Sequence, residues 1–230
     1  MISVPAYLAA GLPPHLALGN NKFSSTFGTL FATARFLRHG MIDLPVAICS
    51  AVCALLGSFL GTRTVLLINP GFLNYILLVM IPLIALLTLT NKSIGRSDRS
   101  GSIPVPKKLV LGTCAGLVIG FYDGFFGPGT GTLLIIFYAV LLRYDFVRAN
   151  GNTKVVNLAS NVASVMTFLA FGRVQFALAI PAAICGIAGN LVGSRLVVKN
   201  GGRIIRPVFL IALCLLFAKI IYDVIFQSLH

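Results

Sequence analysis

The chain has 230 residues, of which 57% are hydrophobic and only 10% are charged, and its formal net charge is +13. Soluble domains carry about 25% charged residues, so this chain has too few charges to cover a surface that faces water. The excess of Lys and Arg would suggest a nucleic-acid partner in a soluble protein, but it is typical of the cytoplasmic loops of a membrane protein. The composition therefore predicts an all-α, polytopic transmembrane protein in a lipid bilayer and argues against nucleic-acid binding.

Long apolar stretches recur along the chain, and each long one approaches the roughly 20 residues that cross a bilayer. In chain order, we expect membrane segments at roughly 2–11, 21–37, 43–62, 72–90, 109–127, 131–142, 151–171, 175–195 and 206–226. The basic stretch 91–108 is expected in the cytoplasm. When every segment crosses, most of the basic loop residues fall on the cytoplasmic side, as the positive-inside rule requires. We therefore favour full crossings over a re-entrant hairpin at 109–142.

The sequence matches itself when its numbering is shifted by 132. Residues 17–65 align with 149–197 without a gap, and 15 of these 49 positions are identical, where chance would give about three. The loop after Phe36 is expected inside and its copy after Phe168 outside, so the two copies have opposite orientations. Inverted repeats are common in secondary transporters, whose binding site lies near the membrane midplane where the repeats meet.

This duplication divides the chain into a first transmembrane repeat at 1–90, a basic cytoplasmic linker at 91–108 and a second repeat at 109–230. The second repeat opens with a helix at about 109. The counterpart of that helix would precede Met1, so we expect the first repeat to lack its first helix. A truncation and a late start are both open explanations, of which we favour the truncation.

Residues 116–131 read GLVIGFYDGFFGPGTG and cannot form one regular helix. Glycine is conformationally permissive and proline lacks an N–H group, so we expect a break over 127–131 and a new helix from about Thr132. Broken backbone at membrane depth is tolerated only within protein or beside a water-filled cavity. The free N–H groups of the second half-helix would attract an anion. Asp123, one turn before the break, either couples transport to protons or caps backbone N–H groups of the loop.

A second polar cluster lies at the start of the segment at 151–171. It contains Lys154 and three asparagines, and its repeat counterpart in the first copy contains Lys22. Two lysines related by the repeat would meet an anion from both sides; the alternative is that each extends to the nearer membrane surface. The predicted substrate-binding residues are Asn20, Lys22, Ser25, Asp123, Gly127, Gly129, Thr130, Gly131, Asn152, Lys154, Asn157 and Asn161.

The sequence shows no nucleophile–base pair and no cluster with metal-ligand spacing, so we expect no enzyme activity, no metal and no cofactor. Cys49 and Cys53 share a helix face, but neither His nor a carboxylate accompanies them, and packing is the favoured interpretation. The small-residue pairs Gly57/Gly61 and Gly189/Gly193 are expected to pack helices, either within one chain or between the copies of a homo-oligomer.

Three stretches together resemble the sulfite exporter TauE/SafE family. They are GFYDGFFGPGTG, the Gly-Asn-Thr-Lys run at 151–154, and Ile205-Arg206-Pro207 followed by Ala218-Lys219 and Tyr222-Asp223. The matching Gly-rich motif of that family's first helix has no counterpart in this chain. The resemblance implies a multi-pass protein of the bacterial cytoplasmic membrane that exports small anions such as sulfite, sulfonates or related organosulfur compounds. A passive anion channel, a non-transporting scaffold and an inactive truncated fragment are the alternatives.

Overall fold

The computed structural model describes residues 3–73, 75–77 and 97–200. In chain order its helices are α1 (Ser3–Ala9), α2 (Pro14–Arg38), α3 (Leu44–Leu67), the short 3-10 helix η1 (Ser100–Ser102), α5 (Val105–Phe125), α6 (Thr130–Val140), α7 (Phe146–Ala170) and α8 (Phe176–Asn200). The described residues contain no strand, and the predicted all-α class is confirmed. The segment predicted at 206–226, with Lys219 and Asp223, lies outside the described residues, as does most of the segment at 72–90.

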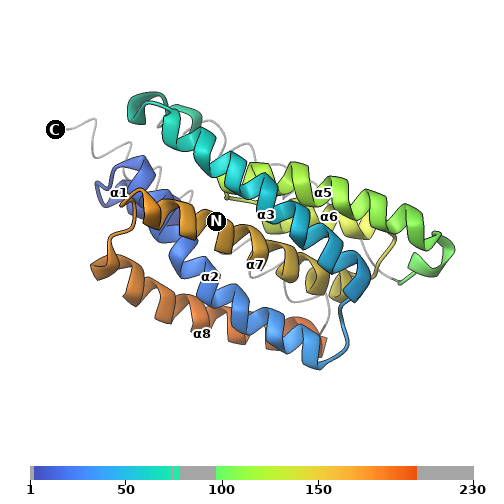
Figure 1. Ribbon diagram of the computed structural model, residues 1–230. Coiled ribbons are helices and arrows are strands. Elements are labelled where there is room, and N and C mark those ends of the chain that lie inside the picture. Colours follow the sequence, from blue (N-terminus) through green and yellow to red (C-terminus); the bar gives the residue numbers. More distant parts are fainter. Residues whose placement is uncertain (1–2, 74, 78–96, 201–230) are drawn as a thin grey trace.

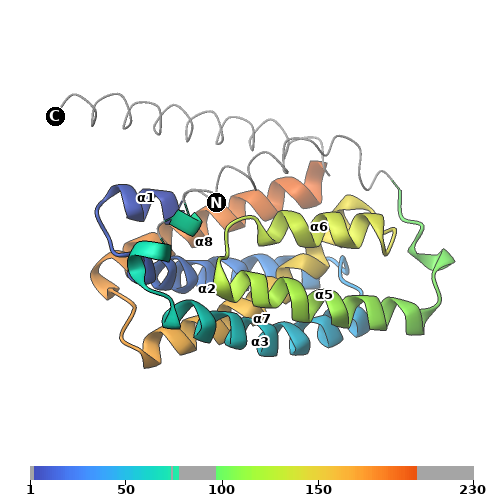
Figure 2. The same cartoon turned by 90° about the horizontal axis from the view of Figure 1, so that it is seen from above.

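Three of the described helices, α3, α5 and α8, are long and apolar enough to cross a membrane. Helices α2 and α7 have 25 residues each, or about 37 Å, but they carry most of the predicted polar site. Helix α6 has only 11 residues, about 16 Å, which is roughly half of the 30 Å hydrocarbon core. It runs back alongside α5 (Figure 2), and it is too short for the full crossing predicted at 131–142.

The helix ends follow from local sequence. Proline lies in the first turn of α2, α3 and α5, where its missing N–H costs no hydrogen bond. Helices α2 and α7 both end at a glycine with a φ of 64°, Gly40 and Gly172. In each case the glycine N–H and the next N–H donate to carbonyls of the last turn, the usual glycine-terminated helix end.

Close glycine contacts join α3 to α5. A methyl group added at Gly116 would collide with the carbonyl of Ser50, and one added at Gly57 would collide with the carbonyl of Leu117. Gly57 and Gly61 therefore pack helices within the chain. Figure 1 shows α7 between the α3–α5 pair and the α2–α8 pair.

The loops before α3, before α5 and before α7 meet at one end of the bundle. Arg99 N–H donates to the Arg143 carbonyl (2.8 Å), and Arg148 forms an ion pair with Asp98 (2.8 Å). Burial alone would raise the pKa of Asp98, but hydrogen bonds from Ser100 and the Arg148 guanidinium outweigh it and hold this pKa below its usual range. This basic end corresponds to the side predicted to be cytoplasmic.

The two copies of the repeat have matching helices. Adding 132 to the bounds of α2 gives those of α7, and adding 132 to the bounds of α3 gives those of α8 to within one residue. Their hydrogen bonds also match: Asn20 Oδ1 accepts from Gln175 N–H (2.8 Å), and Asn152 Oδ1 accepts from Asp43 N–H (3.1 Å). Since residue 152 is 20 + 132 and residue 175 is 43 + 132, these are equivalent bonds that connect the copies reciprocally.

Candidate functional site

The break between α5 and α6 lies where the sequence predicts it. Helix α5 ends at Phe125 and α6 begins at Thr130, two residues before the predicted start. Gly127 and Gly129 both have a φ of 86°, a left-handed conformation that glycine adopts without steric cost. The Tyr122 hydroxyl donates to the Pro128 carbonyl (2.6 Å) and the Thr130 hydroxyl to the Gly127 carbonyl (2.8 Å), and these bonds fix the loop.

The first turn of α6 has free donors. Its N-cap, Gly129, offers no side-chain acceptor. The N–H groups of Gly131 and Thr132 have no hydrogen-bond acceptor among the described residues. Both residues line a cavity of about 270 Å³, so these N–H groups lie at a helix N-terminus that borders open space, where the helix dipole favours an anion.

A buried ion pair lies beside this turn. Lys22 Nζ is 2.8 Å from Asp123 Oδ1, and the two side chains are only 2% and 5% exposed. The same ammonium donates to Asn161 Oδ1 (3.2 Å), and the Ser160 hydroxyl donates to the other carboxylate oxygen of Asp123. Among the described residues, no backbone N–H of the loop donates to this carboxylate. Asp123 therefore pairs with the first-copy lysine instead of capping the loop.

Lys154 lines the same cavity but has a neutral partner. Its ammonium donates to Asn190 Oδ1 (3.0 Å), and the described residues provide no carboxylate within ion-pair distance of it. Neither lysine extends to a membrane surface: Lys22 is 2% exposed and Lys154 points to Asn190.

The cavity draws equivalent residues from both copies. Adding 132 to the numbers of Lys22, Ser25 and Thr29 gives those of Lys154, Asn157 and Asn161. The complete set of described lining residues is Val4, Asn21, Lys22, Ser25, Thr29, Asp123, Gly127, Pro128, Gly129, Thr130, Gly131, Thr132, Lys154, Asn157, Asn161 and Asn190. The structure thus brings ten of the twelve predicted site residues together around one space.

The other two predicted residues, Asn20 and Asn152, do not line the cavity. Each is fully buried and uses its amide oxygen to accept the reciprocal backbone N–H bond described above. Their place in the sequence, beside the lysines, does not reveal that their side chains point to the start of a helix in the other copy.

Two polar residues that hydrogen-bond the charged groups of the site, Asn190 and Ser160, were not predicted from the sequence. Asn190 is a polar residue within α8, which is otherwise strongly apolar, so an isolated amide in a membrane-length segment was the available signal. Ser160 had no such signal, because serine is common in membrane helices as a small packing residue. Its contact with Asp123 depends on how α5 meets α7.

The cavity is rich in hydrogen-bond donors and carries a net positive charge. It holds two ammonium groups against one carboxylate, a formal balance of +1 for Lys22, Lys154 and Asp123. Its lining residues come from α1, α2, α5, α6, α7 and α8 and from the loop between α5 and α6. Two of these helices, α5 and α8, are long and apolar enough to span a bilayer. An intramembrane polar cavity at a break in a helix is a feature of membrane transport proteins.

The comparisons with known proteins identify the family. The family model described as sulfite exporter TauE/SafE matches residues 1–220, and the chain belongs to this family. It is 33% identical over 223 residues to a probable membrane transporter protein of Haemophilus influenzae, covering 97% of this chain and 86% of that protein. No solved structure matches the chain.

Two further relatives have the same description. A probable membrane transporter protein, ORF9, of a Sinorhizobium species is 35% identical over 229 residues, which are 97% of this chain and 84% of the relative. The probable membrane transporter protein YfcA of Escherichia coli is 30% identical over 224 residues, which are 97% of this chain and 82% of the relative. The chain is therefore a member of a membrane transporter family, and not of an enzyme family.

Proposed function

We propose that this protein is a secondary transporter that exports small anions, such as sulfite, sulfonates or related organosulfur compounds, across the bacterial cytoplasmic membrane. The observation that carries the proposal is the cavity between Lys22, Lys154 and the first turn of α6. Ammonium groups and free N–H groups are the donors that bind oxyanions in proteins. The cavity volume of about 270 Å³ is well above the roughly 30 Å³ that a water molecule occupies in the liquid.

We infer that the chain is built from two inverted repeats that meet at this cavity. The reciprocal hydrogen bonds of Asn20 and Asn152 support this inference. So does the contact pattern of α2 and α7, in which Gly19 abuts Arg173 and Gly151 abuts Met41. These contacts place the start of each helix beside the end of the other, so the two equivalent helices run in opposite directions, as inverted repeats require.

Asp123 is the proposed coupling residue. Its carboxylate forms an ion pair with the Lys22 ammonium, so Asp123 and a bound anion compete for the same ammonium group. Protonation of Asp123 removes its charge and releases Lys22 to the anion. A proton and an anion would then bind together and move in the same direction, so an anion leaves the cell with a proton while its outward gradient exceeds the inward proton gradient.

The test is anion flux in proteoliposomes that contain the purified full chain. We expect an imposed proton gradient to change the rate of labelled sulfite transport, Lys154→Met to reduce the flux at least tenfold, and Asp123→Asn to remove the response to the gradient. Lys107→Met is the matched control, because Lys107 is an exposed lysine outside the cavity.

Three results would count against the proposal. Flux that follows only the anion gradient would indicate a passive channel. An absence of flux with every anion would indicate a scaffold. Unchanged transport in both Lys154→Met and Asp123→Asn would leave the cavity without a role.

A further inference from the structure

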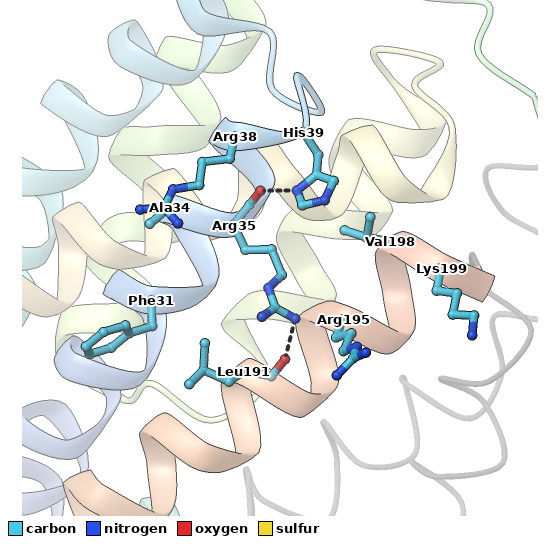
Figure 3. A pocket seen from close by; sticks show the side chains of 9 residues that line it. All are labelled: Phe31, Ala34, Arg35, Arg38, His39, Leu191, Arg195, Val198 and Lys199. Atoms are coloured by element: carbon cyan, nitrogen blue, oxygen red, sulfur yellow. Dashed lines mark hydrogen bonds between the residues drawn. The ribbon is translucent and has the colours of Figure 1, made fainter.

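A second hollow lies on the side of the bundle, between the C-terminal halves of α2 and α8 (Figure 3). Its volume is about 580 Å³, and its described lining residues are Phe31, Ala34, Arg35, Arg38, His39, Leu191, Arg195, Val198 and Lys199. We call it the basic groove. It shares no lining residue with the transport cavity, so its chemistry requires a separate explanation.

The groove concentrates positive charge. Three arginines, a lysine and a histidine line it, and none of the described lining residues is acidic. Arg35 is committed to the fold, because its guanidinium donates to the Leu191 carbonyl (3.0 Å) and its own carbonyl contacts His39 Nδ1 (2.8 Å). Arg38, Arg195 and Lys199 are exposed and remain available to a ligand.

The protein has almost no acid to neutralise these cations. The whole chain contains five acidic residues: Asp43, Asp98, Asp123, Asp145 and Asp223. The first three form ion pairs elsewhere, Asp145 caps α7, and Asp223 lies outside the described residues. Among the described residues, therefore, the exposed cations of the groove have no acidic partner, and a ligand anion would supply the counter-charge.

The repeat provides an internal comparison. The positions that the shift of 132 pairs with Arg35, Arg38, His39, Arg195 and Lys199 hold Thr167, Ala170, Phe171, Arg63 and Leu67. Of these counterparts only Arg63 is basic. Its guanidinium lies over the rings of Phe59 and Phe171, at 5.3 and 4.9 Å from their centroids. Because the same helix packing exists without the charges in the other copy, the fold itself does not require them.

The walls of the groove are apolar where the helices face outward. Phe31 is 43% exposed, and Leu191 and Val198 complete this surface. A ligand that suits the groove combines an anionic group with a hydrocarbon part. The groove also lies toward the basic end of the bundle, the side predicted to be cytoplasmic, and basic pockets between helices on this side of a membrane suit anionic lipid headgroups.

We propose that the basic groove binds an anionic phospholipid of the cytoplasmic leaflet. Its phosphate lies beside Arg195 and Lys199, Arg38 adds positive charge on the α2 side of the groove, and its acyl chain lies against Phe31 and Val198. Arginine and lysine bind phosphate oxygens through charge-assisted hydrogen bonds. The site serves to hold α2 and α8 together at this end and is independent of the anion that the transport cavity binds.

The test compares lipids added to the delipidated, purified full chain in a neutral detergent. We expect phosphatidylglycerol to raise the melting temperature and to remain bound in native mass spectrometry, whereas phosphatidylcholine does neither. The double variant Arg38→Gln/Lys199→Gln should bind phosphatidylglycerol roughly thirtyfold more weakly, at about 1 kcal/mol for each cation removed. The matched control is Arg63→Gln/Arg173→Gln, which removes two cations from the opposite end and should bind the lipid as the unmodified chain does.

Two further measurements distinguish the binding of a lipid from the binding of a free anion. Inorganic phosphate and sulfite, at the same concentration as the lipid phosphate, should neither raise the melting temperature nor displace the lipid. A shift with phosphate that the groove variant abolishes would assign a free-anion site and overturn the lipid assignment. Equal lipid binding by the groove variant and the control would overturn the site itself. The single variant Lys199→Gln, at an exposed position, gives the same comparison if the double variant does not fold.

Discussion

At the scale of single residues, the Lys22–Asp123 pair dominates the energetics of the site. Two charged side chains that are 2% and 5% exposed have lost most of their hydration. Their mutual attraction offsets this desolvation penalty only while both partners are present. Asn161 and Ser160 satisfy the remaining polar atoms. A pair of this kind adds little net stability. The removal of one partner is nevertheless strongly destabilising, because it leaves the other charge buried and unpaired.

A double-mutant cycle measures this dependence. We expect Lys22→Met and Asp123→Asn each to reduce the free energy of unfolding by about 3–5 kcal/mol, and the double variant to lose clearly less than the sum. Denaturation of the purified protein in detergent gives the values. Additive losses would mean that the two residues do not interact directly.

Lys22, Lys154 and Asp123 stand out in the sequence as candidate site residues, but the sequence does not show which of them form a pair. Charges are rare within membrane segments, so each one stands out without any structural information. Which lysine meets the carboxylate depends on the approach of α2 to the end of α5, and these helices are far apart in the chain. Ser160 remained hidden for the same reason.

At the scale of helices, the spacing of glycines determines how α5 lies on α3. Methyl groups at Gly112, Gly116, Gly120 and Gly124 would each meet α3 at closer than contact distance, so the two backbones touch along most of α5. The four-residue spacing made this packing face predictable. The length of α6 was not predictable, because hydropathy does not distinguish a half-length helix from a full crossing.

Gly116→Ala tests the contact between these helices. The new methyl group collides with backbone of α3, which cannot give way as a flexible side chain does, and we expect a loss of about 2–3 kcal/mol in the free energy of unfolding. Gly189→Ala is the control, because a methyl group there meets no described atom within 4 Å, and alanine favours helix by about 1 kcal/mol over glycine. Similar stability of both variants would contradict the close packing.

At the scale of the whole molecule, the sequence repeat accounts for both the arrangement of the helices and the lining of the cavity. The numbering shift between the two copies, visible in the sequence, recurs in the helix bounds, in the glycine-terminated ends and in the paired lining residues of the cavity. What the sequence did not indicate was that Asn20 and Asn152 join the two copies instead of lining the site. An asparagine in a membrane helix suits either role.

Equivalent bonds should have equivalent strength. We expect Asn20→Ala and Asn152→Ala to lower the free energy of unfolding by similar amounts, about 1–3 kcal/mol each, because each leaves one backbone N–H without its acceptor. The losses should be additive in the double variant, since the two bonds lie at opposite ends of α2 and α7. A large loss from one substitution and none from the other would argue against a shared role.

The two lysines lie at different levels along α2. The Lys154 ammonium donates to Asn190 Oδ1 (3.0 Å), and the Asn190 amide lies against Gly28, six residues along α2 from Lys22. Six helical residues span about 9 Å, roughly a third of the hydrocarbon core. One charge that crosses a third of the membrane at 100 mV changes its energy by about 0.7 kcal/mol. In a transporter of this design, membrane voltage would therefore bias which lysine holds the anion, and part of the electrical work would be done inside the protein, within a single cavity.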